Sequence, residues 1–96
     1  MKSYAQFWPY YLAQHRNATC RRLHFIGTTL ALSCAAAALV LHQPLLWLGS
    51  PIAGYGFAWI GHAFFEKNRP ATFRHPWWSL RADFEMYLKM LLGRTL

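Results

Sequence analysis

Four histidines in this chain are spaced so that a folded hairpin would bring them together. His15 and His24 precede one long apolar stretch, His62 lies at the end of a second, and His75 follows it. If the stretches form a hairpin that turns near Gln43, His24 and His62 each lie 19 residues from the turn and reach the same depth. Neutral imidazole binds Zn, Cu, Fe and Ni, so the spacing predicts a metal site on paired membrane helices, which indicates chemistry rather than scaffolding.

A chain break is needed between the first two histidines. His15 and His24 are nine residues apart and would lie on opposite faces of one continuous helix. Asn17 is a favourable helix cap, and a break there would let both side chains converge. We therefore expect a helix to end before Asn17 and a new one to begin after it.

Polar residues near the cluster could support the metal or a substrate. Glu66 lies four residues after His62, on the same helical face, and could complete the ligand set or hold an imidazole in place. Asp83 is the other nearby carboxylate, and Asn17 is a further candidate for this supporting role. The guanidinium groups of Arg69 and Arg74 could bind a substrate carboxylate.

The charged residues avoid one long segment. The chain is 55% hydrophobic, and no Lys, Arg, Asp or Glu lies between Phe25 and Phe65, a segment long enough for two spans of about 20 residues. All ten basic residues flank this segment, which predicts cytoplasmic termini. We assign the net charge of +7 to membrane topology and anionic lipid rather than to nucleic acid, and we expect no nucleic-acid partner.

These patterns predict an all-α integral membrane domain over residues 1–96, with a two-span helical hairpin and amphipathic interfacial helices at both ends. The expected elements are an interfacial helix at 3–15, spanning helices at 18–41 and 51–66, and an amphipathic helix at 77–92. Pro44 marks the turn, and Pro51 marks a further break where the second span would begin. Cys20 and Cys34 are expected to be free thiols.

Small residues follow one face of each predicted span. Each face combines small residues at helical spacing with a histidine toward the cytoplasmic end. The first face consists of His24, Gly27, Ala31, Ala35 and Ala38, and the second of Gly54, Ala58, His62 and Glu66. Such faces let membrane helices approach closely. They could also support a homodimer or a higher homo-oligomer.

Two runs of the chain resemble a known family. They are YYLAQHRNATCRRLHFIGT (10–28) and WIGHAFFEKNRPATF (59–73), which contain a His, an Asn, a second His followed by a Gly, and then Gly-His, Phe-Glu and Pro-Ala pairs. This series resembles the membrane 2-hydroxy fatty acid dioxygenase family, which includes fungal enzymes of the endoplasmic reticulum and short bacterial proteins. The segment HPWWSLRADFEMYLKMLLG (75–93) is similar to the tail of the bacterial branch.

The resemblance implies an Fe(II)-dependent enzyme that uses O2, without 2-oxoglutarate, to shorten a 2-hydroxy fatty acid by one carbon. It implies His15, His24 and His62 as iron ligands, with His75 in the bacterial tail as a further candidate. A 2-hydroxy acid can chelate a metal through its hydroxyl and carboxylate while its acyl chain lies in the bilayer. The resemblance also implies a protein of the bacterial inner membrane.

Two other functions are compatible with the same residues. The chain could be a non-enzymatic membrane interaction or scaffold protein whose histidines are interfacial residues. It could also be a zinc-dependent membrane hydrolase, because histidine sites bind zinc. Bound metal would distinguish an enzyme from a scaffold, and activity without oxygen would favour the hydrolase.

Overall fold

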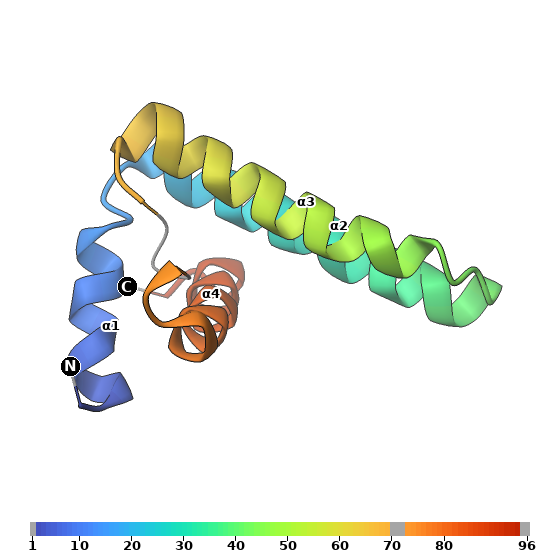
Figure 1. The fold of residues 1–96 in the computed structure, drawn as a ribbon, viewed down its shortest axis with the longest axis horizontal. Helices are drawn as coiled ribbons and strands as arrows, with labels where there is room; N and C mark the ends of the chain where they lie inside the picture. The colour runs from blue at the N-terminus through green and yellow to red at the C-terminus, as the bar shows by residue number, and fades with distance from the viewer. Residues whose placement is uncertain (1, 70–72, 95–96) are drawn as a thin grey trace.

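The computed structural model describes residues 2–69 and 73–94, and within these ranges the regular elements are all helices, with no strand (Figure 1). In chain order, the elements are α1 (Tyr4–Ala13), α2 (Ala18–Leu41), α3 (Leu46–Ile60), the π-helical turn η1 (Gly61–Glu66) and α4 (Pro76–Leu91). Helices α2 and α3 lie side by side and antiparallel as one long arm, while α1 and α4 gather at the end opposite the α2–α3 turn. The prediction of an all-α fold is confirmed over the described ranges.

Helix α2 begins at the cap that the sequence indicated. The Asn17 Oδ1 accepts hydrogen bonds from the backbone N–H groups of Thr19 (2.8 Å) and Cys20 (3.2 Å), which would otherwise have no partner. Its 24 residues make α2 the one described helix that is long and apolar enough to cross a membrane. Helix α3 has 15 residues and continues into η1, so the structure supports one candidate span where the sequence predicted two.

Helix α3 begins at Leu46 rather than at residue 51. Its first turn is tight, with the Leu46 N–H donating to the Gln43 carbonyl at 3.1 Å. Pro51 lies inside the helix without ending it, although its missing N–H removes one backbone hydrogen bond. The preceding Ser50 hydroxyl donates to the Ala31 carbonyl at 2.8 Å and ties this part of α3 to α2.

The small residues allow α2 and α3 to pack closely, as predicted. A Cβ atom on Gly27 would lie 2.8 Å from the Phe57 Cβ and 3.0 Å from the Ala53 carbonyl oxygen, which is too close for any side chain. A Cβ on Gly54 would lie 3.5 Å from the Ala31 Cβ, an ordinary contact. These small faces therefore oppose each other within one chain, rather than lying free for a second copy.

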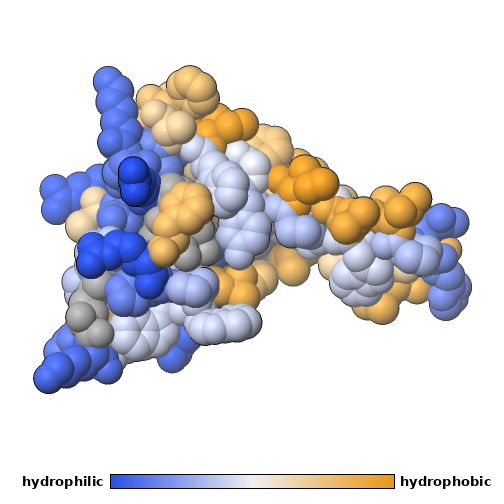
Figure 2. All heavy atoms as spheres, in the orientation of Figure 1, coloured by the Kyte–Doolittle hydropathy of each residue, from blue (hydrophilic) through white to orange (hydrophobic). Residues whose placement is uncertain are grey.

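The other end of the molecule has a separate core. Phe7 and Tyr11 of α1 pack with Ala82 and Met86 of α4, and all four are buried. The arm beyond it is apolar on its outside, whereas hydrophilic residues gather around α1 and α4 and at the tip of the turn (Figure 2). Large exposed apolar residues on the arm include Leu39, Val40, Leu41, Leu45, Leu48 and Ile52. Along the long axis of the molecule, the surface is thus apolar between two polar ends.

Candidate metal centre

Three of the predicted histidines meet where α1 ends, α2 begins and η1 lies. The ring centroids of His15 and His24 are 4.5 Å apart, those of His15 and His62 are 4.4 Å apart, and those of His24 and His62 are 5.1 Å apart. One nitrogen from each ring lies within 4.8 Å of the other two. All three side chains are at most 5% exposed. The cluster is therefore a closed group of imidazoles rather than a set of surface histidines.

The break after α1 places His15 against α2. Asn17 turns the chain, and its backbone N–H donates to the Glu66 carboxylate at the end of η1. The Arg21 side chain donates to the His15 carbonyl from the first turn of α2. These bonds fix the connecting loop at both ends, so that the His15 ring faces His24.

The π-helical turn η1 places His62 and its partner. At the end of this wide turn, Lys67 has a left-handed backbone (φ 57°), and the Lys67 and Asn68 N–H groups both donate to the His62 carbonyl. The chain thereby folds back, and the Asn68 side chain reaches the His62 ring. Turns of this kind occur frequently at functional sites.

A glycine allows this turn to approach α2. A Cβ on Gly61 would lie 2.9 Å from the Cys20 Sγ and 3.5 Å from its Cβ. Any larger residue would separate η1 from the first turn of α2, and so would separate His62 from His24. Cys20 is buried at this contact, and both cysteines are free thiols, as predicted.

Hydrogen bonds determine which nitrogen of each ring is free. In each ring, Nδ1 faces an oxygen that can only accept, so Nδ1 carries the proton and Nε2 carries the lone pair. The acceptors are the Tyr11 carbonyl for His15 (2.7 Å), the Cys20 carbonyl for His24 (2.9 Å) and the Asn68 Oδ1 for His62 (2.6 Å). The Asn68 amide is oriented in turn by its Nδ2, which donates to the Gln14 carbonyl at 3.2 Å.

The free nitrogens of His15 and His24 lie close together. The His15 and His24 Nε2 atoms are 3.1 Å apart, so two lone pairs would face each other unless a cation lies between them. Two nitrogens bound at about 2.1 Å to a single metal lie roughly 3.0–3.4 Å apart, which matches this separation. Burial, and then the neighbouring His24 ring, lower the pKa of His15 to about 2, so this ring is neutral, the form that binds metals. The three residues therefore fit a metal ion.

Comparison with known proteins agrees with the sequence resemblance. A family model described as Mpo1-like, 2-hydroxy-palmitic acid dioxygenase Mpo1-like, matches residues 1–95. The chain belongs to this family. No curated protein and no solved structure matches it. The three-histidine group is thus the candidate metal centre of a member of the Mpo1-like family.

The fourth predicted ligand lies elsewhere. His75 occupies the cap position of α4, where its ring stacks on Trp78 at 5.2 Å and meets the edge of Phe7 at 5.5 Å. Among the described residues, the group that could hold a metal ion consists of His15, His24 and His62 and does not include His75. The aromatic packing between α1 and α4 holds this ring away from the other three.

The two carboxylates also lie outside the ligand group. Glu66 is bonded to the Asn17 N–H, so it fixes the loop and does not hold an imidazole. Asp83 accepts a hydrogen bond from the Tyr11 hydroxyl, and the Tyr11 ring stacks on His15 with centroids 4.0 Å apart. Burial raises the pKa of Asp83 to about 7, and the bond from Tyr11 opposes this shift. Asp83 therefore supports the centre through Tyr11.

The predicted substrate arginines lie on the surface. Arg69 and Arg74 are exposed, and Arg74 lies beside His75. The Pro-Ala pair of the family pattern, at 70–71, lies outside the described residues. His42, at the far turn, is exposed.

Sequence reasoning missed the groups that orient the rings. Two are backbone carbonyls, of Tyr11 and Cys20, each four residues before the histidine that it serves. Every residue has a backbone carbonyl, so the sequence does not indicate which carbonyls accept from a histidine ring. Asn68 lies in the quoted FFEKNRPA block, but its role depends on the reversal of the chain after η1.

Proposed function

We propose that this chain is an Fe(II)-dependent dioxygenase that shortens 2-hydroxy fatty acids by one carbon. The observation that carries the proposal is a buried group of three imidazoles, with one nitrogen of each within 4.8 Å of the other two, in a member of a family described as 2-hydroxy-palmitic acid dioxygenase. The overall change is balanced when one 2-hydroxy acid and one O2 give the shorter carboxylic acid, CO2 and water. The bond between C1 and C2 breaks, C2 is oxidised, and O2 is reduced.

His15, His24 and His62 would hold the iron through their Nε2 atoms. When bound, iron supplies the site for O2 and for the hydroxyl and carboxylate of the substrate. The chain itself fixes the three rings through their Nδ1 protons, which raises the basicity of the ligands and prevents ring rotation. The packing around the cluster excludes bulk water from it.

We further propose that the hairpin spans the bacterial inner membrane with both termini on the cytoplasmic side. The exposed apolar side chains of the arm support this placement. Helix α3 and η1 form one continuous rod from residue 46 to residue 66, about 30 Å long at 1.5 Å per residue, which is the thickness of a bilayer core. Lipid substrate, O2 and the bilayer would be the partners of this chain.

Exposed arginines near the membrane boundary would attract the substrate head group. Arg69 and Arg74 follow the hairpin, on the side where the histidines lie, and we propose that one of them pairs with the substrate carboxylate. The three candidate ligands come from a single chain, so a homodimer would not be needed to assemble them.

Metal analysis of protein purified without oxygen in mild detergent tests the proposal. We expect close to one iron per chain, lost in His24→Ala and in His62→Ala, and O2-dependent conversion of 2-hydroxypalmitate to an acid one carbon shorter. Protein that stays metal-free after Fe(II) is added would favour a scaffold. Zinc in place of iron, with activity that needs no oxygen, would favour a hydrolase.

A further inference from the structure

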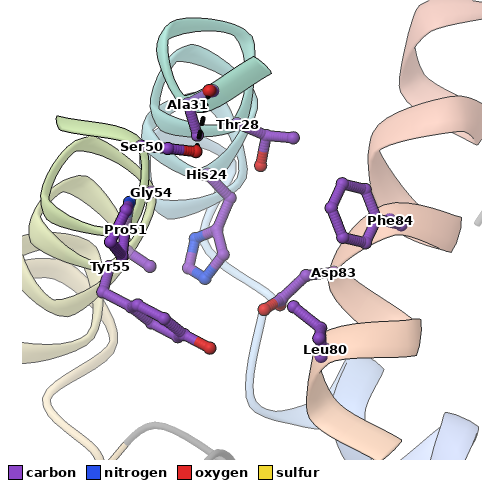
Figure 3. Close-up of a pocket in the computed structure, with 11 residues that line it drawn as sticks. His24, Thr28, Ala31, Ser50, Pro51, Gly54, Tyr55, Leu80, Asp83 and Phe84 are labelled. Carbon is purple, nitrogen blue, oxygen red and sulfur yellow. Dashed lines mark hydrogen bonds between the residues drawn. The ribbon is translucent and has the colours of Figure 1, made fainter. Parts of the chain in front are cut away.

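A cavity adjoins the candidate metal centre. It has a volume of about 220 Å³ and lies between α2, α3 and α4, with His24 in its wall (Figure 3). From His24, the wall continues along α2 through Thr28 to Ala31. This distance is about 10 Å at 1.5 Å per residue. The cavity thus leads from the histidines into the apolar hairpin.

Small residues of the hairpin form the floor of the cavity. Ala31 of α2 and Gly54 and Ala58 of α3 line it, and none of them carries a side chain beyond Cβ. At the far end, the polar hydrogen of the Ser50 hydroxyl is already bonded, because it donates to the Ala31 carbonyl. This end of the cavity therefore suits a hydrocarbon.

Helix α4 forms the roof. Leu80 and Phe84, one turn apart, turn toward the cavity, while the opposite face of the helix packs on α1. Tyr87 fixes α4 to α2, since its hydroxyl lies 3.0 Å from the Thr29 hydroxyl and its ring stacks on Phe25 at 4.8 Å. The roof is therefore anchored beside the cavity.

Polar groups gather at the end near the histidines. The Asp83 carboxylate reaches from α4 toward the His24 ring, and the Tyr55 hydroxyl extends from α3 toward α4 on the same side of the cavity (Figure 3). One Asp83 oxygen accepts from Tyr11, and a carboxylate has a second oxygen that can accept from a hydroxyl. The cavity thus has a polar end at His24 and an apolar end at Ala31, the polarity of a fatty acid with a hydroxyl near its head.

We infer that this cavity, defined by His24, Ala31, Gly54 and Phe84, binds the first part of the substrate's acyl chain. This inference rests on the proposed function, which defines the ligand as a 2-hydroxy fatty acid. An extended zigzag of carbon–carbon bonds of about 1.5 Å advances about 1.25 Å per carbon, so 10 Å accommodates roughly eight carbons. Pockets that enclose a whole ligand measure about 300–1,000 Å³, so this smaller cavity holds the chain next to the head, and the tail continues into the bilayer.

Photo-cross-linking locates the chain directly and needs no turnover. The probe is 2-hydroxypalmitate with a diazirine at carbon 8, added without oxygen to the full chain in mild detergent. Peptide mass spectrometry is expected to place the adducts around Ala31, Pro51 and Phe84. Adducts spread over lipid-facing residues such as Val40 would overturn the inference.

A matched pair of variants provides a second test. Ala31→Leu fills the apolar end and is expected to lower the adduct yield at least fivefold, whereas Ala36→Leu, on the exposed face of the same helix, leaves it unchanged. An equal yield in both variants would overturn the assignment. Iron is measured in the same samples. A wild type without metal would contradict the proposed function, whereas the positions of the adducts would still show whether the cavity binds the acyl chain.

Discussion

Replacing Asn68 by alanine tests whether the oriented rings hold the metal. Asn68 makes no direct contribution to the converging nitrogens. Its Oδ1 instead accepts from the His62 Nδ1 at 2.6 Å, and its Nδ2 donates to the Gln14 carbonyl at 3.2 Å. Within the described residues, Asn68 provides the only hydrogen-bond acceptor for the Nδ1 of the buried His62 ring. Without it, the ring proton can move to Nε2, which then has no lone pair for a metal.

The expected loss follows from that single bond. Removing the group that orients a liganding histidine typically lowers metal affinity by about 10- to 100-fold. This range corresponds to about 1.4–2.8 kcal/mol of binding free energy. Titration of Fe(II) against a competing chelator, without oxygen, measures it. We expect Asn68→Ala to fold with wild-type helix content and to bind iron one to two orders of magnitude more weakly.

Two controls separate orientation from general damage. Asn68→Asp retains an acceptor at the same position and is expected to keep most of the iron affinity, although it loses the bond to Gln14. Gln43→Ala removes an amide at the far, exposed turn and is expected to bind iron like the wild type. Wild-type iron affinity in Asn68→Ala would refute the argument that the Nδ1 acceptors define the site.

Three further predictions address other parts of the chain. His75→Ala is expected to keep its iron while His62→Ala loses it, and equal loss in metal analysis would return His75 to the ligand set. Gly27→Leu brings a Cβ to 2.8 Å from α3 and is expected to destabilise the hairpin by about 1–3 kcal/mol, seen as a lower melting temperature in detergent. The pKa of Asp83 is about 7 in the folded chain, above its ordinary 3.8, so the free energy of unfolding falls as pH rises from 3.8 to 7. Asp83→Asn is expected to flatten this slope in thermal unfolding measured across pH. An unchanged slope would contradict the role of Asp83.

The sequence was sufficient for the features that depend on local pattern. The uncharged segment and the cap at Asn17 predicted where α2 begins, and the equal distances of His24 and His62 from the turn predicted that their rings would meet. A break between His15 and His24 was also predictable, because residues nine apart lie on opposite faces of one continuous helix. These inferences depend on helix periodicity and on one capping residue, and both can be read from the spacing of residues along the chain.

Other features depend on packing between distant segments and could not be predicted. Pro51 predicts the start of the second helix, but α3 begins at Leu46, with a tight first turn and with the Ser50 hydroxyl bonded to the Ala31 carbonyl of α2. The position of His75 after the hairpin predicts that it joins the other histidines. The aromatic contacts with Phe7 and Trp78 that separate it from them join α1 to α4, and no local pattern records such a pairing.

The close packing of the hairpin and the metal centre have a common origin. Gly27 allows α2 and α3 to approach along the arm, and Gly61 allows η1 to approach Cys20 at its end. The same approach brings His24 and His62 together, at the turn of α2 where the Cys20 carbonyl accepts from the His24 ring. A chain with larger residues at these two glycines would still form apolar helices, but its imidazoles would be too far apart to share one ion. Iron binding should therefore be lost in such variants before the helices themselves are lost.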